Sequence, residues 1–232
     1  MKKSIFLLLL FPLLAVAQDK MVIDVASGEK LNEKLSSDTQ YVFPEFIAGQ
    51  VHFTDGQRSG NMLNYNILLG EMHFMDNEEV FAFPDLSKVL VAVVDKRRFF
   101  PFNKTEFCEE ILITPGGARL CVRRKANAVE QSRTGAYGIQ TSASSVRSYN
   151  SIGNSGDGRR VNLQVSGKVR VSIENFYYFL NKGKYVQIKN EKSIAKQFPG
   201  HNAKIEAYVK EHNTNFKNEE DLKALIAYCS EL

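Results

Sequence analysis

Basic side chains concentrate in one stretch of the chain, between residues 119 and 170. That stretch holds ten basic and two acidic side chains, whereas residues 18–118 hold nine basic and sixteen acidic ones. The basic residues of the stretch are Arg119, Arg123, Arg124, Lys125, Arg133, Arg147, Arg159, Arg160, Lys168 and Arg170. Arginine forks pair well with phosphate and carboxylate groups, so the stretch predicts an anion-binding surface. The alternative is a solvated loop whose like charges repel one another and which has no specific ligand.

Within this stretch, five residues are the candidate anion-binding set: Arg123, Arg124, Lys125, Arg159 and Arg160. Arg159 and Arg160 stand where a Ser/Gly-rich loop meets the next predicted strand, and anchoring at one end lowers the entropic cost of ordering a contact. The partners expected for such a surface are an acidic glycan, lipopolysaccharide or another envelope protein. Nucleic acid is not expected as a partner, because no nucleic-acid-binding motif is present.

Patterns that would indicate catalysis or a cofactor are weak. Ser155 lies among glycines, but Gly156 follows it directly, so the Gly-x-Ser-x-Gly pattern of hydrolases is not met. The spacings His-x-His, His-x-x-x-His and Cys-x-x-Cys do not occur, and neither does a phosphate-binding glycine loop. The sequence therefore predicts no cofactor and no metal, and it favours a protein without catalytic activity.

Two of the three cysteines flank a predicted turn at residues 114–117. Register counting around that turn makes Cys108 and Cys121 diagonal neighbours on adjacent strands rather than directly opposite partners. A disulfide between them would need a bulge or another loop length. The sequence leaves open whether the pair is bridged or forms two small buried thiols.

Residues 41–189 contain short runs in which apolar and polar residues alternate, separated by turn signals. Val51 and Phe53 alternate with polar neighbours, while 88–94 is a continuous apolar run that indicates a more buried strand. The aromatic pair 99–100 and the run 176–179 should each place half of their rings in the core, leaving the rest as a stacking platform for sugar or peptide. The spacing predicts an antiparallel meander, or a sandwich or partly open barrel, interrupted by a Ser/Gly-rich basic loop at 126–160.

Two further charged features are predicted to face solvent. His52 and His73 alternate out of phase with their apolar neighbours and should lie on the outer face of the sheet. The acidic pair Glu109–Glu110 should lie at a turn or strand end.

Residues 190–232 have a helical pattern. A short helix is expected around residues 193–198, followed by two amphipathic segments with Asn202 and Asn218 as caps. In the last segment, apolar residues recur at the spacing of one helix face: Leu222, Leu225, Ile226 and Cys229. The fold class predicted is therefore mainly β with a C-terminal helical hairpin packed on the sheet, α+β overall.

The N-terminus has the organisation of a secretory signal peptide. Lys2 and Lys3 precede an apolar run, and residues 15–17 read Ala-Val-Ala, the small-x-small pattern of a cleavage site. Residues 1–17 are therefore predicted to be removed and 18–40 to form a lead-in segment. No later run is long enough for a transmembrane segment. The mature protein is expected in the periplasm or outside the cell.

Several short motifs resemble those of a group of small exported proteins of Bacteroidota. The matching segments are 41–44 (YVFP), Gly49, 55–56 (DG), 63–66 (LNYN), 135–138 (GAYG), 198–199 (FP) and 216–222 (FKNEEDL). The resemblance implies export from a cell of the Gram-negative type. It implies no activity, ligand or catalytic residue.

Together these patterns predict an exported, non-catalytic envelope or secreted protein that binds an anionic envelope component through its basic loop. Two alternatives remain. One is a secreted hydrolase whose site is assembled from residues distant in sequence, and the other is a structural subunit of an exported assembly.

Overall fold

The computed structural model describes residues 20–25, 36–131 and 167–232. The predicted signal peptide and most of the predicted loop, including Arg159 and Arg160, lie outside the described residues. The strands are β1 (Lys20–Val25), β2 (Ile47–Phe53), β3 (Arg58–Asn66), β4 (Glu71–Asp76), β5 (Glu79–Ala82), β6 (Val89–Val94), β7 (Arg97–Pro101), β8 (Phe107–Ile113), β9 (Arg119–Gln131), β10 (Gly167–Asn181) and β11 (Lys184–Ile188). The helices are α2 (Ser37–Gln40), α3 (Glu191–Ala195), α4 (Asn202–Glu211) and α5 (Glu219–Ser230).

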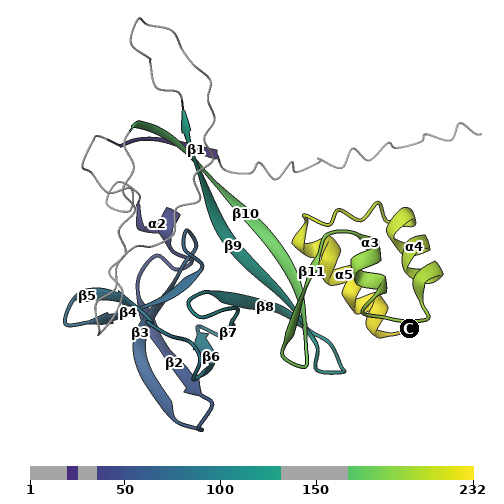
Figure 1. Cartoon of the computed structure of the whole chain (residues 1–232), viewed down its shortest axis with the longest axis horizontal. Helices are drawn as coiled ribbons and strands as arrows, with labels where there is room; N and C mark the ends of the chain where they lie inside the picture. The colour runs from purple at the N-terminus through teal and green to yellow at the C-terminus, as the bar shows by residue number, and fades with distance from the viewer. Residues whose placement is uncertain (1–19, 26–35, 132–166) are drawn as a thin grey trace, which may run out of the picture.

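All described strands belong to one antiparallel sheet in the order β1-β10-β9-β8-β7-β6-β2-β3-β4-β5, with β11 also paired to β10. From β2 onward each strand pairs with its neighbours in sequence except where β6 returns to β2, and β1 pairs with β10. The chain therefore forms two meanders, β2–β5 and β6–β11, joined edge to edge. This confirms the predicted mainly-β, α+β fold with helices at the C-terminus (Figure 1).

Two boundaries differ from the sequence prediction. Strand β9 continues to Gln131, so residues 126–131, assigned to the loop, are strand. Strand β1 lies in the predicted lead-in segment and pairs with residues 167–172 of β10. Its position has a physical reason: β11 covers only residues 177–181 of β10, and backbone groups along an uncovered strand edge favour a further partner.

Side-chain alternation gives the sheet two distinct faces. We call the face that carries Phe99, Val122 and Phe179 the core face, because all three side chains are buried there. The opposite face carries Phe100 and Tyr178, which are half-buried, and we call it the outer face. The predicted division of the aromatic runs into core and non-core rings is confirmed.

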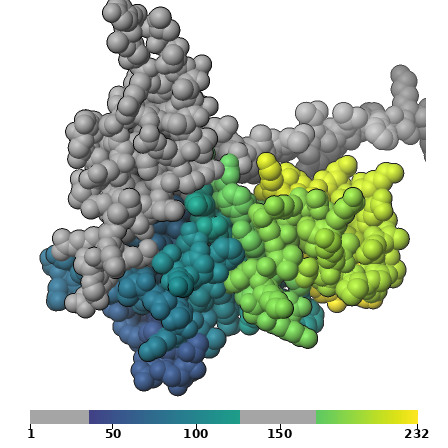
Figure 2. Space-filling view, in the orientation of Figure 1, coloured from purple at the N-terminus to yellow at the C-terminus, as the bar shows by residue number. Residues whose placement is uncertain are grey.

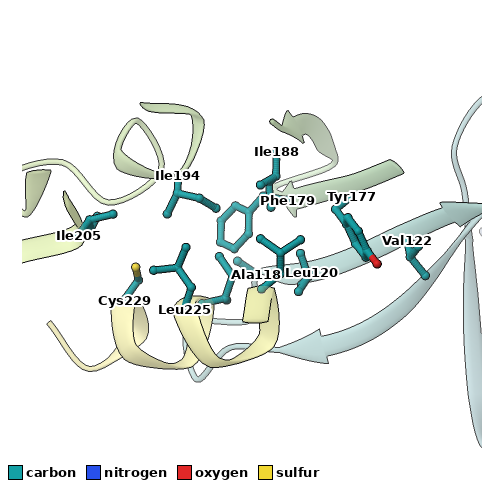
Figure 3. Close-up of a cluster of buried hydrophobic side chains, with 12 residues drawn as sticks. Ala118, Leu120, Val122, Tyr177, Phe179, Ile188, Ile194, Ile205, Leu225 and Cys229 are labelled. Atoms are coloured by element: carbon teal, nitrogen blue, oxygen red, sulfur yellow. The ribbon is translucent and has the colours of Figure 1, made fainter. Parts of the chain in front are cut away.

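The core face carries two separate hydrophobic clusters. The strand core lies over β2–β8, where Tyr65 stacks on Phe99 with ring centroids 4.9 Å apart. The helical core lies over β9–β11, where α3, α4 and α5 pack on the sheet around Phe179 (Figure 3). The helical tail accordingly forms one end of the molecule and β2–β7 the other (Figure 2).

Helix α5 forms where its predicted cap and apolar stripe indicate, whereas α3 and α4 differ from the prediction at their first turns. The Asn218 side chain accepts a hydrogen bond from the Asp221 backbone N–H and caps α5, as predicted. The buried residues of α5 are Leu222, Leu225, Ile226 and Cys229, which confirms the predicted stripe. Helix α3 begins earlier than predicted, because Asn190 and Ser193 form a reciprocal capping box. The prediction that Asn202 caps α4 was wrong: Asn202 is the first residue of the helix, and the capping position is held by His201, whose side chain makes no capping hydrogen bond.

Candidate functional site: an aromatic–arginine surface

Seven side chains on or beside the outer faces of β7, β9, β10 and β11 form a continuous surface of rings and guanidinium groups. We call it the aromatic–arginine surface, and its members are Phe100, Phe102, Tyr178, Tyr185, Arg98, Arg119 and Arg123. The strand register accounts for this grouping, since Cys121 of β9 lies opposite Tyr178 of β10 and Leu180 lies opposite Tyr185. Directly paired residues on neighbouring strands point to the same side of the sheet, and so do residues two apart along one strand. These side chains therefore share the outer face.

Three aromatic rings at one end of this surface contact one another. The Phe102 ring lies 4.8 Å from Tyr178 and 4.9 Å from Tyr185, centroid to centroid, and the two tyrosine rings are perpendicular. The Tyr185 hydroxyl donates to the Pro101 carbonyl at 3.1 Å, which fixes its ring against β7. Burial raises the pKa of Tyr185, so this hydroxyl remains a neutral donor. The rings are thus held rigidly by contacts and by one hydrogen bond.

Three arginine guanidinium groups lie over two rings of the surface, those of Phe100 and Phe102. The Arg119 and Arg98 carbon atoms Cζ lie 4.7 Å and 5.4 Å from the centroid of Phe100. Arg123 lies 4.9 Å from the centroid of Phe102. Stacking of this kind attracts the cation to the ring face and leaves the edge of the guanidinium, with its N–H donors, available.

The glutamates of β8 and of the residues just before it balance these arginines unevenly. Arg123 donates to Glu106 at 2.5 Å, one cation to one carboxylate. Arg98 and Arg119, in contrast, share Glu110, at 3.7 Å and 2.6 Å. Among the described residues, two guanidinium groups therefore face one carboxylate at Phe100. The Arg98 side chain is 44% exposed, so part of it faces solvent.

Two thiols lie directly beneath this surface. Cys108 and Cys121 are fully buried on the outer side of β8 and β9 and are not joined in a disulfide. A bulge between Glu110 and Leu112 shifts the register, and the two cysteines stay diagonal to one another. Of the two alternatives that the sequence left open, the structure has the buried thiols. Burial raises the pKa of Cys108 well above its usual value.

The predicted anion-binding residues do not come together as one set. Arg123 belongs to the aromatic–arginine surface, but Arg124 points to the core face, where it forms an ion pair with Glu109. Lys125 is half-buried at the next position of β9, and Arg159 and Arg160 lie outside the described residues. Arg98, on β7, was missed because it lies in the acidic half of the sequence and reaches this surface only through the β7–β8–β9 pairing.

Glu109 holds a buried ion-pair chain on the core face. Its carboxylate accepts from Arg97 at 2.5 Å and from Arg124, and Arg124 also lies 3.7 Å from Glu219 at the start of α5. Burial alone would raise the pKa of Glu109, but the two arginines lower it overall. The prediction that Glu109 lies at a turn or strand end was wrong: it is 4% exposed in the middle of the sheet.

His73 is also buried, contrary to the prediction of an exposed position. The alternation correctly places it on the outer face, but the chain at Tyr41 and Val42 runs beside β3, and the Tyr41 ring of this covering segment packs against the imidazole. The Tyr41 hydroxyl lies 3.0 Å from His73 Nδ1, and Glu71 Oε2 lies 3.6 Å from Nε2. The covering segment is held by Asn64, whose amide donates to the carbonyls of Phe43 and Glu45. A strand period gives the face of a side chain but not what packs over it.

Within residues 20–25, 36–131 and 167–232, no group of three His, Cys, Asp or Glu side chains is placed to hold a metal ion. In the same part of the chain, no helix combines the length and apolar character needed to cross a membrane.

Comparison of the chain with protein-family models, with curated proteins and with solved structures finds no match in any of the three.

Proposed function

We propose that this protein is an exported, non-catalytic binding protein that takes an anionic component of the cell envelope on its aromatic–arginine surface. The observation that carries the proposal is the sharing of Glu110 by Arg98 and Arg119. A guanidinium has five N–H donors and prefers a planar carboxylate or a phosphate as its partner. A second acidic group, supplied by a ligand, would balance the second guanidinium. Export is supported by the signal-peptide pattern of residues 1–17.

The surroundings of the arginine pair favour binding over a merely solvated charge. Both guanidinium groups already stack on Phe100, so their orientation is fixed before a ligand arrives. Preorganisation of this kind lowers the entropic cost of forming the contact. A long lysine on a loop would lack this advantage.

The test is binding of polygalacturonate, an acidic glycan, compared with dextran, a neutral one, by the mature protein. The wild type should bind polygalacturonate and not dextran, and affinity should fall as salt is raised from about 0.01 M to about 0.15 M, because the screening length falls from about 30 Å to about 8 Å. The double variant R98A/R119A should bind at least about tenfold more weakly, the loss expected for one charged hydrogen bond.

The control is K204A/K210A, which removes the same charge from exposed positions of α4. This variant should bind like the wild type. Equal weakening in both double variants would show that only net charge matters. The proposal would be refuted if the wild type at low salt bound neither polygalacturonate nor purified lipopolysaccharide.

A further inference from the structure

A pocket separate from the aromatic–arginine surface lies on the core face, at the far end of the helical core. It is a pocket of about 360 Å³ between the β8–β9 turn, the end of β10, the α3–α4 connection and the end of α5. Ala118, Phe179 and Cys229, which line it, lie between the sheet and the helices (Figure 3). The volume falls within the range of about 300–1,000 Å³ typical of small-ligand sites.

The floor and one wall of this pocket are aromatic. The rings of Phe179 and Phe198 have centroids 5.5 Å apart and planes inclined at 56°, so they form a corner. Phe179 is buried in the helical core, and the half-buried Phe198 packs against that core from the α3–α4 connection. Because Phe179 is only 2% exposed, the apolar contact open to a ligand is provided mainly by Phe198, with Pro199 and Leu232 beside it.

The rim of the pocket carries neutral hydrogen-bonding groups. The side-chain amides of Asn181 and Gln197 make no hydrogen bond within the described part of the chain, and each offers two donors and one acceptor. The hydroxyls of Thr114 and Ser230 donate to the carbonyls of Ala118 and Ile226, which leaves their lone pairs as acceptors. The rim thus presents donors and acceptors within one small site.

No lining side chain is a carboxylate, a lysine or an arginine, and His201 adds an imidazole that can donate or accept a hydrogen bond. Burial raises the pKa of the lining Cys229 to about 11, so its thiol is protonated at neutral pH. The ligand of this pocket should therefore carry hydrogen-bonding groups, because a purely apolar molecule would leave the rim amides unpaired.

We propose that this pocket binds one neutral sugar ring, with the C–H face of the ring against Phe198 and its hydroxyls on Asn181 and Gln197. A pyranose combines the two required surfaces, an apolar face and an equatorial belt of hydroxyls that both donate and accept. A peptide segment could also satisfy amides, but it would use its backbone rather than a compact ring, and it serves as the competing ligand in the test.

The experiment is saturation-transfer NMR of the mature protein with glucose, galactose and N-acetylglucosamine, and with the blocked tripeptide Ala-Ala-Ala, at equal millimolar concentrations. At least one sugar should receive magnetisation, and the tripeptide should not. N181A and Q197A should each weaken that sugar at least tenfold, whereas Q187A, which removes an amide from the outer face of β11, should leave it unchanged. Melting temperatures should show that all three variants fold.

Three results would overturn the proposal. These are no transfer to any sugar, sugar binding that is unaffected by both N181A and Q197A, or displacement of the sugar by the tripeptide. The pocket variants should bind polygalacturonate as the wild type does. Failure here is therefore separate from failure at the aromatic–arginine surface.

Discussion

Glu109 lies on the core face with two arginines within ion-pair distance and almost no contact with water. Because its pKa is lowered in the folded state, it stabilises the protein at pH values above the ordinary glutamate pKa. That contribution is lost as the pH falls through the folded-state pKa, where the carboxylate is protonated. The acid sensitivity of the fold should therefore depend on this one residue more than on exposed carboxylates.

Replacing Glu109 by Gln should lower the free energy of unfolding at pH 7 by about 3 kcal/mol, near the lower end for a broken buried ion pair because Arg97 is one-third exposed. The difference between variant and wild type should shrink as the pH is lowered, since protonation removes the same charge from the wild type. Urea unfolding at pH 7 and at acidic pH measures both effects.

The matched control is Glu206→Gln, at an exposed position of α4. It should change stability by less than about 0.5 kcal/mol at either pH. A gap between E109Q and the wild type that does not depend on pH would contradict the role assigned to the Glu109 charge.

At the scale of elements, α5 depends on the sheet. Its twelve residues are too few for a stable helix in water, so its stability must come from packing of its buried stripe. Leu225 is fully buried against the helical core. Leu225→Ala should therefore lower the free energy of unfolding by about 2–5 kcal/mol.

Thermal unfolding of L225A measures this loss, and Ala224→Ser on the exposed side of the same helix is the control. A melting temperature equal to that of the wild type would show that α5 is not docked through Leu225. A large loss in A224S would assign the effect to helix propensity instead.

The sequence predicts correctly those elements whose caps and apolar spacing depend only on residues close in sequence. The cap at Asn218 and the stripe of Leu222 and Leu225 need only neighbours within α5. The alternation of Phe99 and Phe100 likewise gives the faces of β7. What the sequence could not show depends on distant partners, such as the return of β6 to β2.

The candidate site illustrates the same limit. Arg119 and Arg123 stand out in the sequence, but their carboxylate partners come from β8 and the residues before it, and a bulge sets the register. Counting along the chain gave the basic residues without the acids that face them in space. Arg98 became part of the surface only through two successive strand pairings.

At the scale of the whole molecule, one continuous sheet carries two hydrophobic cores on the same face. Between them lies the ion-pair chain of Arg97, Glu109, Arg124 and Glu219. Ion pairs of this kind couple the stabilities of the two cores less strongly than shared apolar side chains would, because much of their Coulombic gain is offset by desolvation.

The strand core and the helical core should therefore unfold locally in separate opening events. Amide hydrogen exchange should reveal two protected units, one centred on Tyr65 and Phe99 and the other on Phe179 and Leu225. In L225A, exchange should accelerate in α3–α5 and β11 while protection of β3 and β6 stays as in the wild type. Uniform acceleration throughout would indicate a single cooperative unit. With separate opening, the helical tail would detach from the sheet while the strand core around Tyr65 and Phe99 stays folded.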